Sequence, residues 1–207
     1  MKVFLSISFL VIIFLCSCSS YKFPNATGSR VIPTTAVNSY FIDTAQTSIY
    51  RCKINAFKKD LNGTLVIKTL SADEHRVALL SDFGQTVFDI SILPNSYEAH
   101  YVMDDLNKKL LVKELSSLFR TLTQQQYSQE SLLFTETQHW PVYVVGKSYY
   151  QYKERQLSLI TWVLRNKARA EIAFTDFNGA QAQTIHIAHK RFPLTIELLF
   201  DAQQSVN

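Results

Sequence analysis

Alternating apolar and polar residues are the dominant pattern of the chain from about residue 49 onward. Alternation over about four to eight residues is typical of a β-strand with one buried face. Two pairs, Asn62-Gly63 and Asn178-Gly179, indicate tight hairpin turns. The pattern predicts ten strands, over residues 49–57, 64–70, 76–82, 85–93, 97–103, 142–152, 156–164, 168–175, 182–188 and 194–200.

A second pattern, with apolar residues three and four positions apart, occupies the middle of the chain and predicts one helix. Asp104 can cap this helix, and Lys108, Lys109, Lys113 and Arg120 lie on its polar face. We expect a loop over residues 126–141, while residues 36–45 are ambiguous and fit a short helix. The apolar face of the predicted helix comprises Leu106, Leu110, Leu111, Leu115, Leu118, Phe119 and Leu122.

The order of these elements places the chain in the α+β class, because strands and helix do not alternate as in a β-α-β fold. One helix is too small to cover ten strands. A sheet that curls around its own apolar face solves this problem. We therefore predict a curved, incomplete antiparallel β-barrel of about ten strands with a helical lid. The residues alone leave open whether its interior is a solid core or a cavity.

Composition and motifs exclude several function classes. The chain is 47% hydrophobic with a formal charge of +4 and no block of Lys or Arg, which argues against nucleic-acid binding. It lacks the sequence motifs of phosphate loops, dinucleotide folds, zinc proteases and α/β-hydrolases. His186 and His189 lie three apart on a strand and hence on opposite faces, so we expect no metal site and no cofactor. Cys52 alternates with apolar residues and fits a small buried side chain.

The N-terminus resembles a targeting sequence. Lys2 precedes an apolar stretch, residues 3–15, that is too short to span a membrane and fits a secretory signal peptide. The junction Leu15-Cys16-Ser17-Cys18 resembles the lipobox of bacterial lipoproteins. That resemblance implies cleavage before Cys18, which receives a diacylglyceryl thioether and an acylated amine. An ordinary signal peptide with incidental cysteines is the alternative. In the same resemblance, an aspartate directly after the acylated cysteine favours retention in the inner membrane; this chain has Ser19 there, so we expect the outer membrane, on its periplasmic face.

These features divide the chain into three parts. Residues 1–17 form the predicted signal peptide, residues 18–36 a flexible tether rich in Ser, Thr, Asn and Pro, and residues 37–207 the folded domain. Two or more acyl chains on Cys18 anchor a protein stably. We therefore expect a lipid-anchored monomer.

Residues 76–90, with the sequence RVALLSDFGQTVFDI, resemble the LolB-like lipoproteins of the LolA/LolB-like fold, as does the order of elements from about residue 50 to 201. The resemblance implies an incomplete barrel with a helical lid around a hydrophobic cavity for lipoprotein acyl chains. It also implies a short loop that presents an apolar residue just before a glycine, here Phe83. LolB has Pro before that apolar residue, whereas this chain has Asp82.

An uncharacterised branch of LolB-like lipoproteins, associated with aryl-polyene or fatty-acid-type gene clusters, is similar in two further places. These are Trp140-Pro141 and the run IHIAHK over residues 185–190. His139-Trp140-Pro141 fits either the rim of a ligand entrance or a loop anchored on the core.

The predicted function is non-catalytic binding or transfer of acylated, hydrophobic cargo, with a periplasmic carrier protein as a partner. Phe83 is either a membrane-touching transfer residue or an aromatic ring that folds back onto the sheet. The alternatives are a scaffold with a filled core that docks a protein partner and, more remotely, an enzyme acting on acyl groups. The predicted cavity lining comprises Ile54, Leu65, Ile67, Leu79, Phe88, Ile90, Tyr101, Leu111, Leu115, Phe119, Ile172, Ile196 and Leu198.

Overall fold

The computed structural model describes residues 21–57, 59–134, 140–179 and 181–201, and its strands form one antiparallel sheet. The spatial order of the strands is β1-β7-β8-β9-β10-β11-β12-β13-β2-β3-β4-β5-β6. Their bounds are β1 Ala26–Asn38, β2 Thr47–Ala56, β3 Lys59–Thr69, β4 His75–Ser81, β5 Thr86–Ile92, β6 Tyr97–Val102, β7 Gln126–Phe134, β8 Val142–Val145, β9 Ser148–Lys153, β10 Gln156–Leu164, β11 Lys167–Asn178, β12 Gln181–His189 and β13 Leu194–Phe200.

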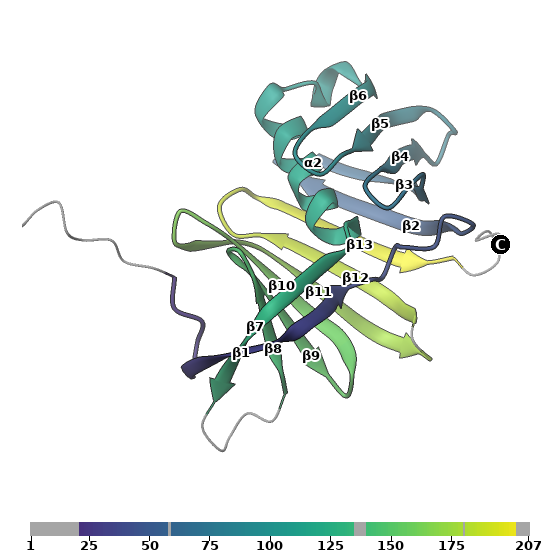
Figure 1. Cartoon of the computed structure of the whole chain (residues 1–207). Helices are drawn as coiled ribbons and strands as arrows, with labels where there is room; N and C mark the ends of the chain where they lie inside the picture. Colours follow the sequence, from purple (N-terminus) through teal and green to yellow (C-terminus); the bar gives the residue numbers. More distant parts are fainter. Residues whose placement is uncertain (1–20, 58, 135–139, 180, 202–207) are drawn as a thin grey trace, which may run out of the picture.

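The sheet is strongly curved and open, with β1 at one edge and β6 at the other (Figure 1). A short 3-10 helix, η1 (Asp104–Leu106), leads into the helix α2 (Lys109–Thr123), which lies within the curve of the sheet (Figure 1). The predicted α+β class, with a curved incomplete barrel and a helical lid, is therefore confirmed. The sheet has thirteen strands rather than about ten.

Each predicted strand has a counterpart within a few residues of its expected bounds. The segment predicted as one strand over residues 142–152 is two strands, β8 and β9, because the chain turns at Gly146-Lys147, where Gly146 has φ +56°. Positive φ at Gly179 likewise supports the predicted turn after Asn178.

Strands β1 and β7 were missed, and their discovery corrects two predictions. Residues 26–36 of the predicted flexible tether belong to β1, and residues 126–134 of the predicted loop form β7. The two strands pair from Ala26↔Phe134 to Asn38↔Gln126. Most side chains of β1 are exposed, so burial imposed no alternation on its sequence, although its backbone pairs as in any sheet. The short helix fitted to residues 36–45 is absent from this described segment.

The β1–β7 pairing is irregular. Its register shifts between Ala26 and Gly28, between Val31 and Thr35 and between Ala36 and Asn38. Pro33 lies within the second of these irregularities, and proline cannot donate a ladder hydrogen bond. The pairing of the edge strand β1 with β7 is therefore interrupted at its middle.

Two local predictions about turns and caps were also wrong. Asn62-Gly63 lies inside β3, and the chain leaves β2 through Phe57, which has φ +51°. Asp104 starts η1 instead of capping α2, whose N-cap is Lys108 without a side-chain cap hydrogen bond.

Helix α2 buries its apolar face against the interior of the sheet. Leu118, Phe119 and Leu122 are fully buried, and the rings of Phe119 and Phe88 of β5 lie 5.8 Å apart. Burying each such side chain contributes about 1.5–3 kcal/mol. Polar contacts fix the C-terminal half: Arg120 donates to the carbonyl oxygens of Leu93 and Ser96 at 2.8 and 2.6 Å. The helix is thus held both by its core and by the β5–β6 turn.

Candidate functional site

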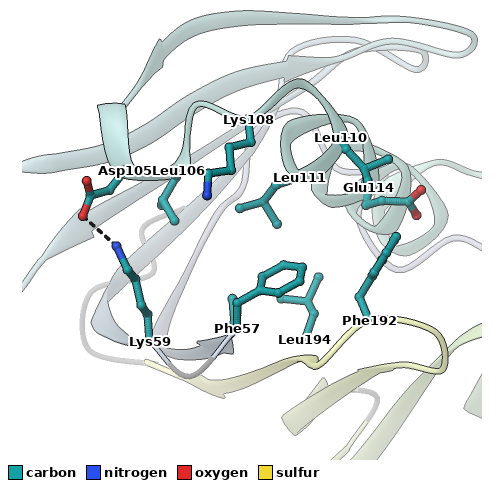
Figure 2. A pocket seen from close by; sticks show the side chains of 11 residues that line it. Phe57, Lys59, Asp105, Leu106, Lys108, Leu110, Leu111, Glu114, Phe192 and Leu194 are labelled. Carbon is teal, nitrogen blue, oxygen red and sulfur yellow. Dashed lines mark hydrogen bonds and ion pairs between the residues drawn. The ribbon is translucent and has the colours of Figure 1, made fainter.

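An apolar pocket opens between the start of α2, the β2–β3 turn and the β12–β13 turn; we call it the lid pocket (Figure 2). Its volume is about 170 Å³. Seven of its eleven lining residues are apolar. The lining comprises Ala56, Phe57, Lys59, Asp105, Leu106, Lys108, Leu110, Leu111, Glu114, Phe192 and Leu194.

Two strand turns form the floor of the lid pocket. The left-handed backbone at Phe57 points this side chain out of the β2–β3 turn, and its ring lies 6.2 Å from that of Phe192. The amide of Phe57 donates to the carbonyl oxygen of Pro193 at 3.0 Å, which ties the two turns together. Leu110 and Phe57 are about half exposed, at 56% and 52%, so the pocket has an apolar mouth.

Charged side chains border this apolar mouth. Lys59 and Asp105 form an ion pair of 2.8 Å at one end of the lid pocket (Figure 2). The hydrogen bond from Lys59, followed by its positive charge, lowers the pKa of the Asp105 carboxyl. Lys108 extends towards the same space from the chain before α2 (Figure 2). The pocket therefore combines apolar walls with cations at its rim.

A buried polar cluster, the Glu114 network, joins α2 to strands β11 and β12. Glu114 of α2 accepts hydrogen bonds from Arg169 of β11 at 2.5 and 3.3 Å, and its second oxygen lies 3.3 Å from Nε2 of His189 in β12. These three side chains are only 8%, 11% and 0% exposed. Glu114 also lines the lid pocket, so the network fixes one wall of it.

The tautomer of His189 follows from its partners. Its Nδ1 accepts hydrogen bonds from the backbone amides of Arg191 and Phe192 at 3.1 and 2.9 Å. The proton of a neutral ring is therefore on Nε2, which donates to Glu114. Burial lowers the pKa of His189, and the charges of Arg169 and Arg191 lower it further, against the opposing effect of Glu114. His189 thus serves the network as a neutral donor.

Most of the predicted cavity lining lies in the packed interior. Ile54, Leu65, Ile67, Leu79, Phe88, Ile90, Leu115, Phe119, Ile172, Ile196 and Leu198 are all at most 4% exposed and belong to one apolar cluster. Of the thirteen predicted residues, only Leu111 lines the lid pocket. Tyr101 was wrongly assigned to the interior: it is 49% exposed, because β6 is the edge strand and most of its side chains face solvent.

Phe83 lies in the turn between β4 and β5 and is 92% exposed. Gly84 has φ +78°, and its amide donates to the carbonyl oxygen of Ser81 at 2.8 Å. Asp82, at the position where LolB has proline, pairs with Arg51 at 3.0 Å. The ring therefore does not fold back onto the sheet, and the turn presents it to solvent.

Other sequence candidates fall in different places. Cys18 and His139 lie outside the described residues. Trp140 borders a separate shallow cavity with Tyr143 and Tyr152. Cys52 is buried, and burial raises its pKa to about 12, which makes it a poor nucleophile.

Two further searches of the described ranges gave negative results. No group of three or more His, Cys, Asp or Glu residues that could hold a metal ion occurs in residues 21–57, 59–134, 140–179 and 181–201. Within the same ranges, no helix has the length and hydropathy needed to cross a membrane.

No protein-family model matches the chain, and no curated protein matches it. Among solved structures, it is similar to a LolA superfamily protein from Nitrosomonas europaea, with 6% identity, a TM-score of 0.46 and coverage of 80% of this chain and 88% of the other. It is also similar to a domain from Vibrio parahaemolyticus that is assigned to an outer membrane lipoprotein-sorting protein. There the identity is 9%, the TM-score 0.35 and the coverage 80% of this chain and 89% of the other.

Sequence reasoning missed the residues that form the floor and rim of the lid pocket: Phe57, Lys59, Asp105 and Phe192. One usable signal was present. Phe57 and Phe192 are large aromatic residues at turns, where polar residues are the norm, as was recognised for Phe83. The pairing of the two turns depends on strands far apart in sequence and had no such signal.

Proposed function

We propose that this protein is a non-catalytic, outer-membrane-anchored lipoprotein that binds acylated cargo in the lid pocket and passes it on. The observation that supports the proposal is the apolar pocket beneath the first turns of α2, with cations at its rim. Apolar walls with a few polar groups at the mouth are typical of sites for amphiphilic ligands. Burial of apolar surface at about 25 cal/mol per Å² would supply the affinity.

The size of the lid pocket limits what it holds in this state. At about 170 Å³ it is close to the roughly 150 Å³ cavity that accommodates a benzene ring. It is smaller than the roughly 300–1,000 Å³ of common ligand pockets. The end of one acyl chain fits, whereas several chains require α2 to move away from the sheet. Binding of a cargo with several acyl chains therefore requires α2 to open as a lid.

The anchor and the turn at Phe83 complete the proposal. An acylated Cys18 would hold the domain beside its membrane. Phe83, exposed on that tethered domain, would insert into the lipid interface when cargo is delivered, because an aromatic ring favours this environment.

The test is uptake of a fluorescent fatty acid by the full chain carrying Cys18→Ser, purified in non-ionic detergent and measured by native mass spectrometry and fluorescence. We expect one bound acyl ligand. Leu111→Trp should fill the lid pocket and weaken binding about tenfold or more, the loss of about 1.4 kcal/mol. Val31→Trp, on the exposed surface of β1, is the matched control and should bind normally. Absence of any acyl ligand on the unmodified pocket, or normal binding by Leu111→Trp, contradicts the proposal.

The second candidate is a scaffold that docks a protein partner. It is favoured by the near-complete burial of the interior side chains, which leaves only Leu111 of the predicted lining in the lid pocket. A scaffold would take up no fatty acid, and filling the lid pocket would leave its partner binding unchanged. The same uptake experiment therefore separates the two functions.

A further inference from the structure

A strongly basic groove shares the lining residue Glu114 with the lid pocket. It runs between α2 and the turns β10–β11 and β12–β13, with a volume of about 1060 Å³. We call it the basic groove. Its cationic residues are Lys113, Arg165, Lys167, Arg169, Lys190 and Arg191, and Glu114 is the one acidic residue among its lining side chains.

Most of this positive charge is not neutralised within the described part of the chain. Arg169 pairs with Glu114, and Lys190 pairs with Glu171 at 2.5 Å. The other four, Lys113, Arg165, Lys167 and Arg191, make no ion pair with another described residue. Four exposed cations that line one groove repel one another, and a bound anion relieves this repulsion.

The basic groove and the lid pocket are neighbours with opposite polarity. Glu114 lines both, and Phe192 of the lid pocket stacks on His189 at 4.8 Å. The guanidinium carbon of Arg169 lies 5.1 Å from the centre of the same Phe192 ring. A single layer of side chains therefore separates an apolar compartment from a cationic one.

This juxtaposition fits an amphiphile with an anionic head. Lys and Arg side chains bind phosphate oxygens through charge-assisted hydrogen bonds, Arg in bidentate fashion. Trp162, which also lines the groove, has the amphipathic character that suits the boundary between a head group and a chain. We propose that the basic groove binds the phosphate ester of an anionic lipid whose acyl chain enters the lid pocket. This inference rests on the function proposed above for the lid pocket.

The experiment compares two lysolipids of equal chain length on the full chain carrying Cys18→Ser, in non-ionic detergent, by native mass spectrometry. Lysophosphatidylglycerol is anionic, and lysophosphatidylcholine is zwitterionic. We expect the anionic lipid to bind about tenfold more tightly, because its net negative charge is attracted to the unpaired Lys and Arg side chains of the groove. The preference should weaken as salt is raised.

Lys113→Glu combined with Lys167→Glu should reduce the anionic preference to about onefold without loss of lysophosphatidylcholine binding. Lys68→Glu with Lys153→Glu is the matched control, because both lysines are exposed on β3 and β9, outside the groove, and the preference should remain. Equal binding of the two lipids, or an unchanged preference in the groove variant, overturns the inference and leaves the proposed function standing. Failure of both lipids to bind overturns the proposed function and, with it, this inference.

A third arm separates a lipid head group from a free phosphate ester. Glycerol phosphate, which has no acyl chain, should compete only weakly with lysophosphatidylglycerol, because it gains nothing from the lid pocket. If it binds as tightly as the lipid, the groove is a site for small phosphate esters and the amphiphile assignment is wrong.

Discussion

Gly63 allows the backbones of β3 and β4 to approach closely. It lies inside β3, opposite Ser81 of β4, and a Cβ placed on it would lie 1.9 Å from the carbonyl oxygen of Leu80. The neighbouring β4–β5 pairing shifts register at Leu79/Leu80. Glycine is therefore required here by the approach of another backbone and not by a turn, which is what Asn62-Gly63 indicated from sequence.

Gly63→Ala should destabilise the protein by about 2 kcal/mol or more, because the clash is with backbone that cannot move aside without breaking the ladder. Gly28→Ala is the matched control. It lies in β1, where the nearest atom to an added Cβ is Leu133 Cδ1 at 3.7 Å. We expect this control to change the free energy of unfolding by no more than about 0.5 kcal/mol. Urea denaturation of both variants tests the prediction, and equal stabilities would contradict it.

His189 makes stability depend on pH. Its pKa is lowered in the folded state, mainly by burial, so the unfolded chain takes up a proton first as pH falls. The contribution of the neutral ring is therefore complete above its ordinary pKa of about 6.5 and is lost as pH falls towards the folded-state pKa. His75, also buried, shifts in the same direction.

We expect the free energy of unfolding to fall from pH 7.5 to pH 5, and to fall less steeply in His189→Gln, whose side chain does not titrate. Urea denaturation at several pH values provides the measurement. Parallel slopes for the two proteins would show that His189 does not contribute.

At the scale of the element, the Glu114 network holds α2 against strands β11 and β12. Removing one partner of a buried ion pair leaves the other charge uncompensated, which costs about 3–5 kcal/mol. Arg169→Ala should therefore destabilise the protein by about 3 kcal/mol and speed hydrogen exchange in the first turns of α2.

Arg76→Ala is the matched control, because Arg76 makes a similarly short ion pair with Asp89, at 2.6 Å, but its side chain is 46% exposed. An exposed pair contributes about 0–1 kcal/mol. If both variants lose the same stability, or if hydrogen exchange in α2 is unchanged in Arg169→Ala, the Glu114 network does not hold α2 in place.

The elements also show what sequence could and could not predict. Strands with one buried face, such as β13, in which Leu194, Ile196 and Leu198 are buried, were predicted nearly to the residue. β1 and β7 were missed because their pairing depends on backbone hydrogen bonds between segments about one hundred residues apart. The spacing correctly predicted that Leu115, Leu118, Phe119 and Leu122 are buried, but Leu110 is 56% exposed and Leu106 belongs to η1. The cap of α2 was not predicted, since Lys108 has no capping side chain.

In the candidate site too, residues in a local pattern were predicted, and contacts between distant segments were not. Leu111 was identified because it belongs to a periodic pattern on one helix. Phe57 and Phe192 face each other only because two turns from distant strands meet, and no local pattern records that meeting. Glu114 is a charged residue on the buried side of α2, and its sequence context gave no sign that Arg169 and His189 would reach it.

At the scale of the whole molecule, delivery of cargo to a membrane should depend on Phe83. Phe83→Glu removes an apolar contact worth about 1.5–3 kcal/mol when buried in a lipid interface, so transfer of a fluorescent fatty acid to vesicles should slow about tenfold. Because the side chain is 92% exposed, unfolding should be unchanged within about 0.5 kcal/mol.

Val31→Glu places the same charge on another side chain that is 88% exposed, in β1, and should transfer cargo normally. Stopped-flow fluorescence on the anchored chain measures the rates. Equal slowing in both variants would mean that any added charge impedes transfer and that the β4–β5 turn has no special part.

The open sheet has a consequence for the proposed membrane anchor, which would confine many copies of the protein to one plane. At such a high local concentration, two free strand edges favour pairing between neighbouring copies and, eventually, aggregation. β1 resists this through Pro33 and the breaks in register around it, and β6 through its short length and the polar side chains of Glu98 and His100. We therefore expect the irregular edges to limit strand pairing between neighbouring copies, so that the sheet can remain open.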